Sequence, residues 1–155
     1  MIELVRKIKS TSNGKTISVA ESCTGGMLSS YLTSIAGSST YFTAGIVSYS
    51  NEAKVKLLSV SLQSLTEYGA VSEPVAKEMA LACKKITNSN IAVSITGVAG
   101  PEGGTLSKPV GMVCFGIVND SEVQTYTYHL KGDREHIRQE ACKIALQMTL
   151  DLLQT

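Results

Sequence analysis

The chain has 155 residues, a formal net charge of +1 and a hydrophobic fraction of 43%. This length suits one folded domain, and the apolar fraction is too high for a disordered protein. The basic residues are scattered, and no apolar run approaches the roughly 20 residues that span a bilayer, so composition argues against a nucleic-acid or membrane partner. The charged, amphipathic first residues do not resemble a signal peptide. We therefore expect a single domain over residues 1–155 in the cytoplasm.

Apolar spacing and β-branched runs predict elements that alternate along the chain. In chain order, we expect a helix over residues 1–12, a strand over 16–20, a helix over 25–34, a strand over 41–49, helices over 51–58, 61–67 and 72–85, strands over 90–96, 110–118 and 122–130, and a helix from 133 to the C-terminus. Helices and strands interleave early, and a hairpin comes late. This order predicts a three-layer α/β/α sandwich with a mixed, mostly parallel sheet.

Capping residues mark several of the predicted helix ends. Thr24, Asn51 and Asp133 are expected as N-caps, because each carries a side-chain oxygen that can accept from a first-turn amide. Pro74 lies in a predicted first turn, where its missing N–H does no harm. Gly69 suits a C-cap.

Three clusters of polar and glycine residues each follow the end of a predicted strand, at residues 20–26, 49–54 and 96–111. The strand over 90–96 is almost continuously apolar, which is typical of a strand covered on both faces. Ligands of open α/β sheets gather where strand ends and their loops converge. We therefore expect these clusters to lie near one another at the sheet edge.

Ser22 and Cys23 are alternative nucleophiles at the first of these strand-to-helix turns. A strand tip can present a serine to a cleft, and the backbone N–H groups of residues 24–26 could form an oxyanion hole. The alternative is that Ser22 only caps a turn or helix. Residue types alone leave the choice between hydroxyl and thiol open.

Lys54 is a candidate general base. If Asn51 caps the helix, Lys54 lies in the first turn, where the helix dipole disfavours a cation by roughly 0.3–1 kcal/mol. That bias lowers the lysine pKa, and burial in a cleft would lower it further. Tyr49, at the preceding strand end, could relay a proton or orient the lysine. The alternative is a solvated surface lysine beside a core tyrosine.

The loop over residues 97–108 is rich in glycine and follows a buried strand. It matches neither the GxxxxGK[ST] spacing of a P-loop nor GxGxxG, so ATP or NAD binding through those motifs is not indicated. Its backbone N–H groups could still form a phosphate cradle. The alternative is an irregular surface loop.

The four cysteines do not indicate a metal site. They are widely spaced without a CxxC pair, and His129 and His136 are the only histidines that could join them. We expect Cys83, Cys114 and Cys142 to be buried free thiols.

Together these clusters resemble one family, the CinA carboxy-terminal domain family. The resemblance rests on motifs that occur in order along nearly the whole chain: residues 20–26 (AESCTGG), 35–39 (IAGSS), 49–54 (YSNEAK), 69–75 (GAVSEPV), 97–101 (GVAGP), 108–111 (KPVG) and 132–134 (GDR). The chain begins almost at the matching region, so it resembles the single-domain form of the family.

The resemblance implies hydrolysis of nicotinamide mononucleotide to nicotinate mononucleotide and ammonia, on an α/β/α sandwich. It implies a serine mechanism without metal or cofactor, with Ser22 as nucleophile and Lys54 and Tyr49 as its partners. It also implies a homodimer or higher homo-oligomer, as does a predicted helix over 74–85 with apolar residues beyond one stripe. The residues expected to contact substrate are Glu21, Cys23, Thr24, Gly25, Gly26, Asn51, Thr96, Gly97, Ala99, Gly100, Gly103 and Gly104.

Two other functional classes stay open at this point. One is a nucleotide-binding module that does not turn its ligand over. The other is an interaction domain, related to competence or damage responses, whose motifs are only caps and turns. Ammonia release separates catalysis from the first, and stabilisation by ligand separates both from the second.

Overall fold

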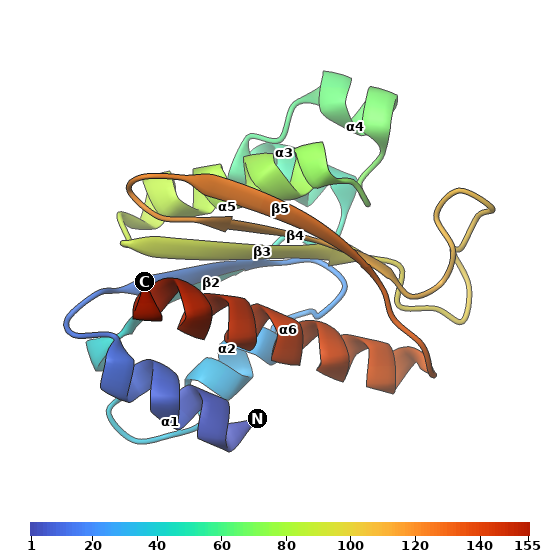
Figure 1. The fold of residues 1–155 in the computed structure, drawn as a ribbon. Coiled ribbons are helices and arrows are strands. Elements are labelled where there is room, and N and C mark those ends of the chain that lie inside the picture. Colours follow the sequence, from blue (N-terminus) through green and yellow to red (C-terminus); the bar gives the residue numbers. More distant parts are fainter.

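A five-stranded sheet runs through the computed structural model, which describes residues 1–155 (Figure 1). In chain order, the strands are β1 (Ile17–Glu21), β2 (Phe42–Val47), β3 (Ile91–Gly97), β4 (Met112–Val118) and β5 (Val123–His129). Their spatial order is β2-β1-β3-β4-β5. Strand β1 pairs in parallel with β2 and β3, whereas β3–β4 and β4–β5 are antiparallel. The predicted mixed sheet is confirmed, but its parallel and antiparallel pairings are equal in number.

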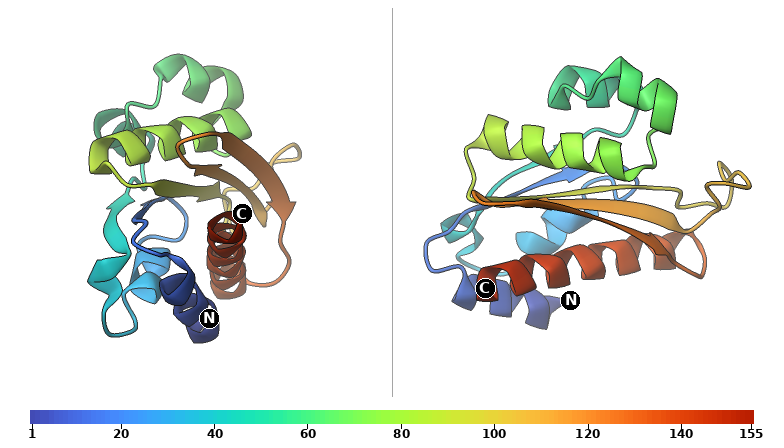
Figure 2. Two further views of the ribbon diagram at one scale, coloured as in Figure 1. Left: turned by 60° about the vertical axis from the view of Figure 1, so that its left-hand side comes forward. Right: turned by 45° about the horizontal axis from the view of Figure 1, so that its top comes forward.

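Helices cover both faces of this sheet, which confirms the predicted three-layer α/β/α sandwich. One face carries α1 (Ile2–Thr11), α2 (Met27–Leu32) and α6 (Arg134–Gln154), and the other carries α3 (Asn51–Leu58), α4 (Leu62–Tyr68) and α5 (Glu73–Thr87) (Figures 1 and 2). A short 3-10 helix, η1 (Ser38–Thr40), precedes β2. No helix has the combination of length and apolar character that crossing a membrane requires.

Each face of the sheet has its own apolar core. The larger core joins α1, α2 and α6 to the sheet through side chains such as Ile8, Leu28 and Leu146. The smaller core packs α5 against the opposite face, through Val75 and Met79. Strand β3 is buried along almost its whole length, as its continuous apolar sequence predicts, because it lies at the centre of the sheet between both layers.

Two of the predicted N-caps are wrong, whereas that of α6 is correct. Ser50, not Asn51, caps α3, because the Ser50 hydroxyl accepts from the Ala53 amide at 3.0 Å. Helix α2 begins at Met27, and its N-cap position is Gly26 rather than Thr24. Asp133 caps α6 as expected, since its carboxylate accepts from the third amide of that helix at 2.8 Å.

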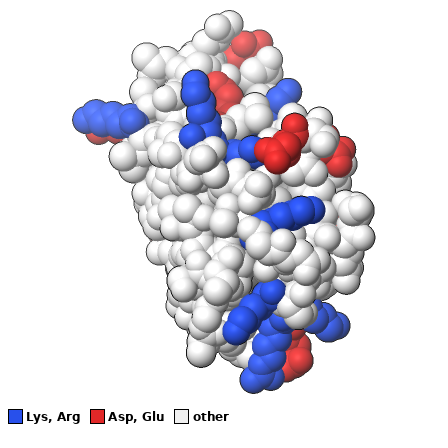
Figure 3. Space-filling view, turned by 90° about the vertical axis from the view of Figure 1, so that its left-hand side faces the viewer, with Lys and Arg blue, Asp and Glu red and all other residues white.

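Charged side chains do not form a continuous basic surface on the face drawn in Figure 3. Lysines and arginines lie at several separate places there, with acidic side chains near them. This arrangement agrees with the scattered charges of the sequence and its net charge of +1.

Candidate active site

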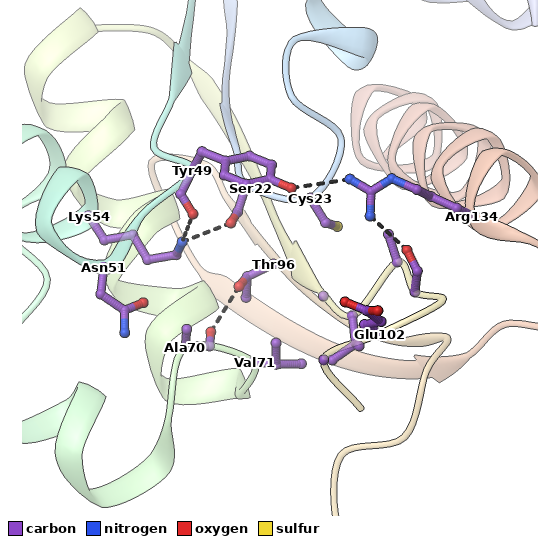
Figure 4. Close-up of a pocket in the computed structure, with 15 residues that line it drawn as sticks. Ser22, Cys23, Tyr49, Asn51, Lys54, Ala70, Val71, Thr96, Glu102 and Arg134 are labelled. Carbon is purple, nitrogen blue, oxygen red and sulfur yellow. Dashed lines mark hydrogen bonds between the residues drawn. The ribbon is translucent and has the colours of Figure 1, made fainter. Parts of the chain in front are cut away.

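A cavity of about 290 Å³ opens where β1 and β3 end and where the segment after β2 begins (Figure 4). The three clusters that follow these strands meet at this cavity, as the sequence predicts. Its lining residues are Ser22, Cys23, Tyr49, Asn51, Lys54, Ala70, Val71, Thr96, Gly97, Val98, Ala99, Gly100, Glu102, Gly103 and Arg134.

Lys54 and Ser22 are in direct contact inside this cavity. The Nζ atom of Lys54 donates to the Ser22 Oγ atom at 2.7 Å. Ser22 follows the last residue of β1, and Lys54 comes from α3 on the other side of the cavity mouth (Figure 4). The lysine also donates to the backbone carbonyls of Ser48 at 2.9 Å and of Tyr49 at 3.3 Å. All three ammonium hydrogens therefore have an acceptor.

Burial sets the protonation of Lys54. The side chain is only 1% exposed, and no carboxylate lies within ion-pair distance of it. Burial disfavours the ammonium form and lowers the pKa of Lys54 from 10.5 to about 8. Loss of solvent is thus the main cause of the shift, rather than the helix dipole that the sequence suggests, and a surface lysine is excluded.

The neutral form of Lys54 is already oriented for proton transfer. A neutral amine has two hydrogens and one lone pair, and the carbonyls of Ser48 and Tyr49 can accept both hydrogens. The lone pair then faces the Ser22 hydroxyl. This arrangement can remove a proton from Ser22 without any rearrangement of the side chains.

Cys23 lies beside this pair but in a poor environment for a nucleophile. The residue is only 6% exposed, and burial raises the pKa of the Cys23 thiol to about 11, so the thiolate is scarce at neutral pH. No side-chain hydrogen bond reaches the Cys23 sulfur, whereas Lys54 binds the neighbouring hydroxyl. These contacts favour Ser22 over Cys23.

The turn after Ser22 leaves two amides without an acceptor. The Ser22 amide donates to the Ile95 carbonyl at 3.0 Å, and the Gly25 amide donates back to the Ser22 carbonyl at 3.0 Å. The amides of Cys23 and Thr24 make no hydrogen bond within the chain. Cys23 lines the cavity, whereas Thr24 is fully buried and does not, so the Cys23 amide is the available oxyanion donor. The amides of Gly25 and Gly26 donate to Ser22 and Glu21, contrary to the range that the sequence suggests.

Glu21 lies outside the cavity and holds helix α2. It is fully buried, and its Oε1 atom accepts from the amides of Gly26 at 3.2 Å and Leu28 at 2.9 Å. Its Oε2 atom accepts from the Ser29 amide at 2.9 Å and from the Ser29 hydroxyl at 2.7 Å. A carboxylate at the helix N-terminus satisfies amides that lack a local cap. Of the residues expected to contact substrate, those absent from the lining are Glu21, Thr24, Gly25, Gly26 and Gly104.

Tyr49 contacts Lys54 through its backbone only. Its side chain is 58% exposed, and its hydroxyl accepts from the Nη2 atom of Arg134 at 3.2 Å. Arg134, in the first turn of α6, also donates from Nη1 to the Gly100 carbonyl at 2.7 Å. One guanidinium therefore joins the segment after β2 to the glycine loop (Figure 4). Sequence reasoning did not select Arg134 as a site residue, although its GDR motif belongs to the family pattern.

The glycine loop forms the wall opposite Lys54. The amides of Ala99, Gly100 and Gly103 make no hydrogen bond within the chain, so they are free to donate to a ligand. Gly100 has a φ of +81°, a conformation that glycine adopts without strain. Glu102 is the only acidic residue of the lining, and it was not among the residues expected to contact substrate.

The floor of the cavity also contains residues that sequence reasoning missed. The hydroxyl of Thr96, an expected residue, donates to the Ala70 carbonyl at 2.9 Å and fixes the segment before α5 against β3. Ala70 and Val71 line the cavity in this way, and Val98 lines it from the loop. Their small apolar side chains carry no chemical signal. No group of three His, Cys, Asp or Glu side chains is placed to hold a metal ion.

The fold and the cavity together define an α/β/α domain with a buried serine–lysine pair at the ends of its central strands. The CinA family, described as the CinA C-terminal domain, matches residues 2–153, and the chain belongs to this family. It is 47% identical over 136 residues to a CinA-like protein of Fervidobacterium nodosum, which covers 88% of this chain and 33% of that relative. It is 49% identical over 135 residues to a CinA-like protein of Syntrophomonas wolfei, and this match covers 87% of this chain and 32% of that relative. The chain thus spans about a third of the length of these relatives.

Solved structures of this family share the whole fold. The competence/damage inducible protein CihA of Agrobacterium tumefaciens superposes with a TM-score of 0.94 at 39% identity, covering 99% of this chain and 95% of that one. A competence or damage-inducible protein of Enterobacter asburiae gives a TM-score of 0.94 at 35% identity, covering 98% and 97%.

Proposed function

We propose that this chain hydrolyses the carboxamide of nicotinamide mononucleotide, giving nicotinate mononucleotide and ammonia. The observation that carries the proposal is the 2.7 Å contact between the buried amine of Lys54 and the Ser22 hydroxyl. The choice of substrate rests on the CinA resemblance, and the adjacent glycine loop supports it.

Acylation begins with the neutral form of Lys54. Its Nζ atom takes the Ser22 proton while Oγ bonds to the carboxamide carbon, and the carbonyl oxygen becomes an oxyanion. The amide of Cys23, a lining residue, has no acceptor within the chain and can donate to that oxyanion. The Lys54 ammonium then gives the proton to the amide nitrogen, the C–N bond breaks, and ammonia leaves. The product of this half-reaction is an ester of nicotinate mononucleotide on Ser22.

Deacylation repeats the same steps with water. Lys54, neutral again, takes a proton from a water molecule while the water oxygen bonds to the ester carbon. The proton then passes to Ser22 Oγ as the ester bond breaks, which frees nicotinate mononucleotide and restores the serine.

The other wall of the cavity suits the nucleotide part of the substrate. The amides of Ala99, Gly100 and Gly103, which make no hydrogen bond within the chain, can converge on an anion, as the N–H groups of backbone nests do. Arg134 adds a positive charge beside them, and Tyr49 helps to orient it. Asn51 and Thr96 line the space between this wall and Ser22. We propose that the phosphate binds at the loop and the ring lies toward Lys54.

The deciding experiment is a coupled ammonia assay on the purified protein. Nicotinamide mononucleotide should release ammonia, whereas the riboside and free nicotinamide, which lack the phosphate, should be poor substrates. Activity should persist in EDTA, because no cysteine–histidine set has metal spacing. Stabilisation by the mononucleotide without ammonia release would instead identify a binding module. Equal turnover of riboside and mononucleotide would contradict the proposal that the glycine loop binds the phosphate.

A further inference from the structure

We propose that Glu102 is a specificity-determining residue that accepts hydrogen bonds from the 2′- and 3′-hydroxyls of the substrate ribose. The site would then select ribonucleotides over their deoxy counterparts. This inference rests on the proposed function and assigns a contact to the sugar, which lies between the reacting carboxamide and the phosphate. Glu102 belongs to the glycine loop and lines the cavity across from Lys54 (Figure 4).

The carboxylate of Glu102 has no partner within the chain. Its side chain is exposed, and it is the only acidic side chain of the lining. In the loop segment 101–108, side-chain hydrogen bonds are made by Thr105, Ser107 and Lys108, and not by Glu102. No lysine, arginine or histidine nitrogen lies within 4.0 Å of the Glu102 oxygens. The carboxylate can therefore accept hydrogen bonds from a ligand.

Arg134 lines the same cavity without pairing to Glu102. Its guanidinium donates to the Gly100 carbonyl at 2.7 Å and to the Tyr49 hydroxyl at 3.2 Å, and both acceptors are neutral. One cation and one anion thus line this cavity without neutralising each other. An ionised carboxylate only accepts hydrogen bonds. A ligand that satisfies both groups must offer an anion to Arg134 and a hydrogen-bond donor to Glu102.

The chemistry of the mononucleotide leaves one candidate for that donor. Its ionised phosphate is an acceptor, and we place it at the loop amides and Arg134. Its carboxamide carries N–H donors, but the carboxamide carbon must lie at the Ser22 Oγ atom, on the Lys54 side of the cavity. The two ribose hydroxyls are the remaining donors. An acidic side chain also binds the ribose 2′-hydroxyl in dinucleotide-binding folds, so this pairing has a general chemical basis.

Contacts on both sides of Glu102 hold the loop that carries it. Before it, the Gly100 carbonyl accepts from Arg134. After it, the Lys108 ammonium donates to the Tyr68 carbonyl at the end of α4. The backbone at Glu102 therefore has a fixed place beside the amides that we assign to the phosphate.

Loss of Glu102 should affect ribose and deoxyribose ligands differently. A carboxylate repels a nearby phosphate, so its removal cannot weaken a ligand that gains nothing from the carboxylate. It weakens only a ligand whose hydroxyls Glu102 holds. Because Glu102 is exposed, a deoxy ligand leaves it hydrated rather than buried without a partner. The preference should therefore be moderate, roughly 5- to 30-fold.

Turnover of nicotinamide mononucleotide and of its 2′-deoxy analogue tests the inference. The wild type should prefer the ribonucleotide in kcat/KM by the factor given above. Glu102→Ala and Glu102→Gln should reduce this preference to less than about threefold, by raising KM for the ribonucleotide with little change in kcat. The matched control is Glu67→Ala, which removes an exposed negative charge from α4 outside the lining and should keep the wild-type preference. Melting temperatures verify that each variant is folded.

Ligands without a ring separate the sugar from the cationic pyridinium. Calorimetry should show that ribose 5-phosphate binds the wild type several-fold more tightly than 2-deoxyribose 5-phosphate does. Glu102→Ala should weaken the binding of ribose 5-phosphate alone. If Glu102→Ala binds ribose 5-phosphate normally but the mononucleotide weakly, Glu102 attracts the ring cation and the inference is overturned.

The inference is also overturned if the wild type uses both mononucleotides equally, or if folded Glu102→Ala keeps the preference or loses both activities alike. If the wild type releases no ammonia but prefers ribose 5-phosphate through Glu102, the proposed hydrolysis fails and the ribose contact stands. If the wild type is active and its preference does not depend on Glu102, only the inference fails.

Discussion

The Nζ atom of Lys54 lies 2.7 Å from the Oγ atom of Ser22, and its other two acceptors are the carbonyls of the residues that follow β2. The segment leaving the edge strand β2 therefore orients the lysine, and the neighbouring strand β1 presents the serine. The proposed reactivity of the pair depends on the protonation state of the buried Lys54 amine.

The activity should rise with pH through the pKa of Lys54. Only the neutral amine can accept the Ser22 proton, and the pKa of Lys54 is about 8. We expect kcat/KM for nicotinamide mononucleotide to increase about tenfold per pH unit well below pH 8 and to level off above it. Ammonia assays between pH 6 and 10 measure this profile. Lys54→Arg, which stays protonated, should be inactive throughout; a flat wild-type profile would contradict a lysine base.

Stability should respond to the same titration, with a defined sign. The folded pKa of Lys54, about 8, lies below the unfolded value of 10.5, so the unfolded chain binds more protons between these values. The stability associated with Lys54 is therefore present above pH 10.5 and is lost as pH falls through about 8. Relative to Lys54→Met, the wild type should gain about 2 kcal/mol in its free energy of unfolding between pH 7 and pH 10.

Urea unfolding of wild type and Lys54→Met at both pH values tests this linkage. Other groups that titrate over this range are present in both proteins, so their contributions cancel in the difference. Parallel changes in the two proteins would show that Lys54 has an ordinary pKa. The same variant should also lose turnover without a comparable rise in KM.

Substitution at Ser22 and at Cys23 should give opposite outcomes. Ser22→Ala removes the atom that Lys54 contacts, so deamidation should fall by at least about a thousandfold while the melting temperature is retained. Cys23→Ala keeps the backbone amide, and its activity should fall by less than about tenfold. The rate of ammonia release by each variant shows which of the two residues is the nucleophile. Activity in Ser22→Ala together with its loss in Cys23→Ala would move the nucleophile to the thiol.

Gly45 and Ser29 should show strong energetic coupling. A Cβ atom at Gly45 would lie 2.0 Å from the Ser29 Oγ atom, which donates to Glu21. Gly45→Ala should therefore destabilise the wild type by about 2 kcal/mol, because the hydroxyl must leave its place. In a Ser29→Ala background the same change should cost at least about 1 kcal/mol less. Additive free energies of unfolding in this double-mutant cycle would argue against the contact.

Self-association stays a prediction. Helix α5 presents Leu81 at 41% exposure, and Ile86, near its end, is 57% exposed. We expect a homodimer or larger homo-oligomer, because exposed apolar side chains favour contacts between copies and closed twofold symmetry is the usual form. Light scattering at the assay concentration measures the assembly. A fully active monomer would contradict the predicted oligomer. Leu81→Lys should weaken an assembly that uses helix α5.

Local signals in the sequence were enough to place Ser22 and Lys54 at the same cavity. Strand pattern, glycine turn and helix spacing put Ser22 and Lys54 at neighbouring strand ends, and the parallel pairing of β1 and β2 brings those ends together. Lys54 lines the cavity as expected, although its pKa is lowered mainly by burial. Burial of a single side chain depends on every element around it, so no local pattern could supply that cause.

The residues that were missed or misplaced depend on contacts between distant segments. The role of Glu21 requires helix α2 to begin at Met27, which depends on the positive φ angles of Gly25 and Gly26. Arg134 reaches the cavity only because α6 packs on the sheet face across β3 and β4. Neither position differs from a surface residue by type or spacing alone.

The contact between Glu21 and Ser29 also limits how this site can be moved by protein engineering. Transfer of residues 20–26 and Lys54 to another sheet would carry the proposed nucleophile and base, but not the support of the turn. The hydroxyl of Ser29 reaches Glu21 across a space that Gly45, on the edge strand, leaves open. A designer must therefore provide an edge strand with a glycine at the matching register, or rebuild the helix start with a different donor. The smallest transferable unit is therefore the paired strands β1 and β2 with the helices α2 and α3, rather than a loop.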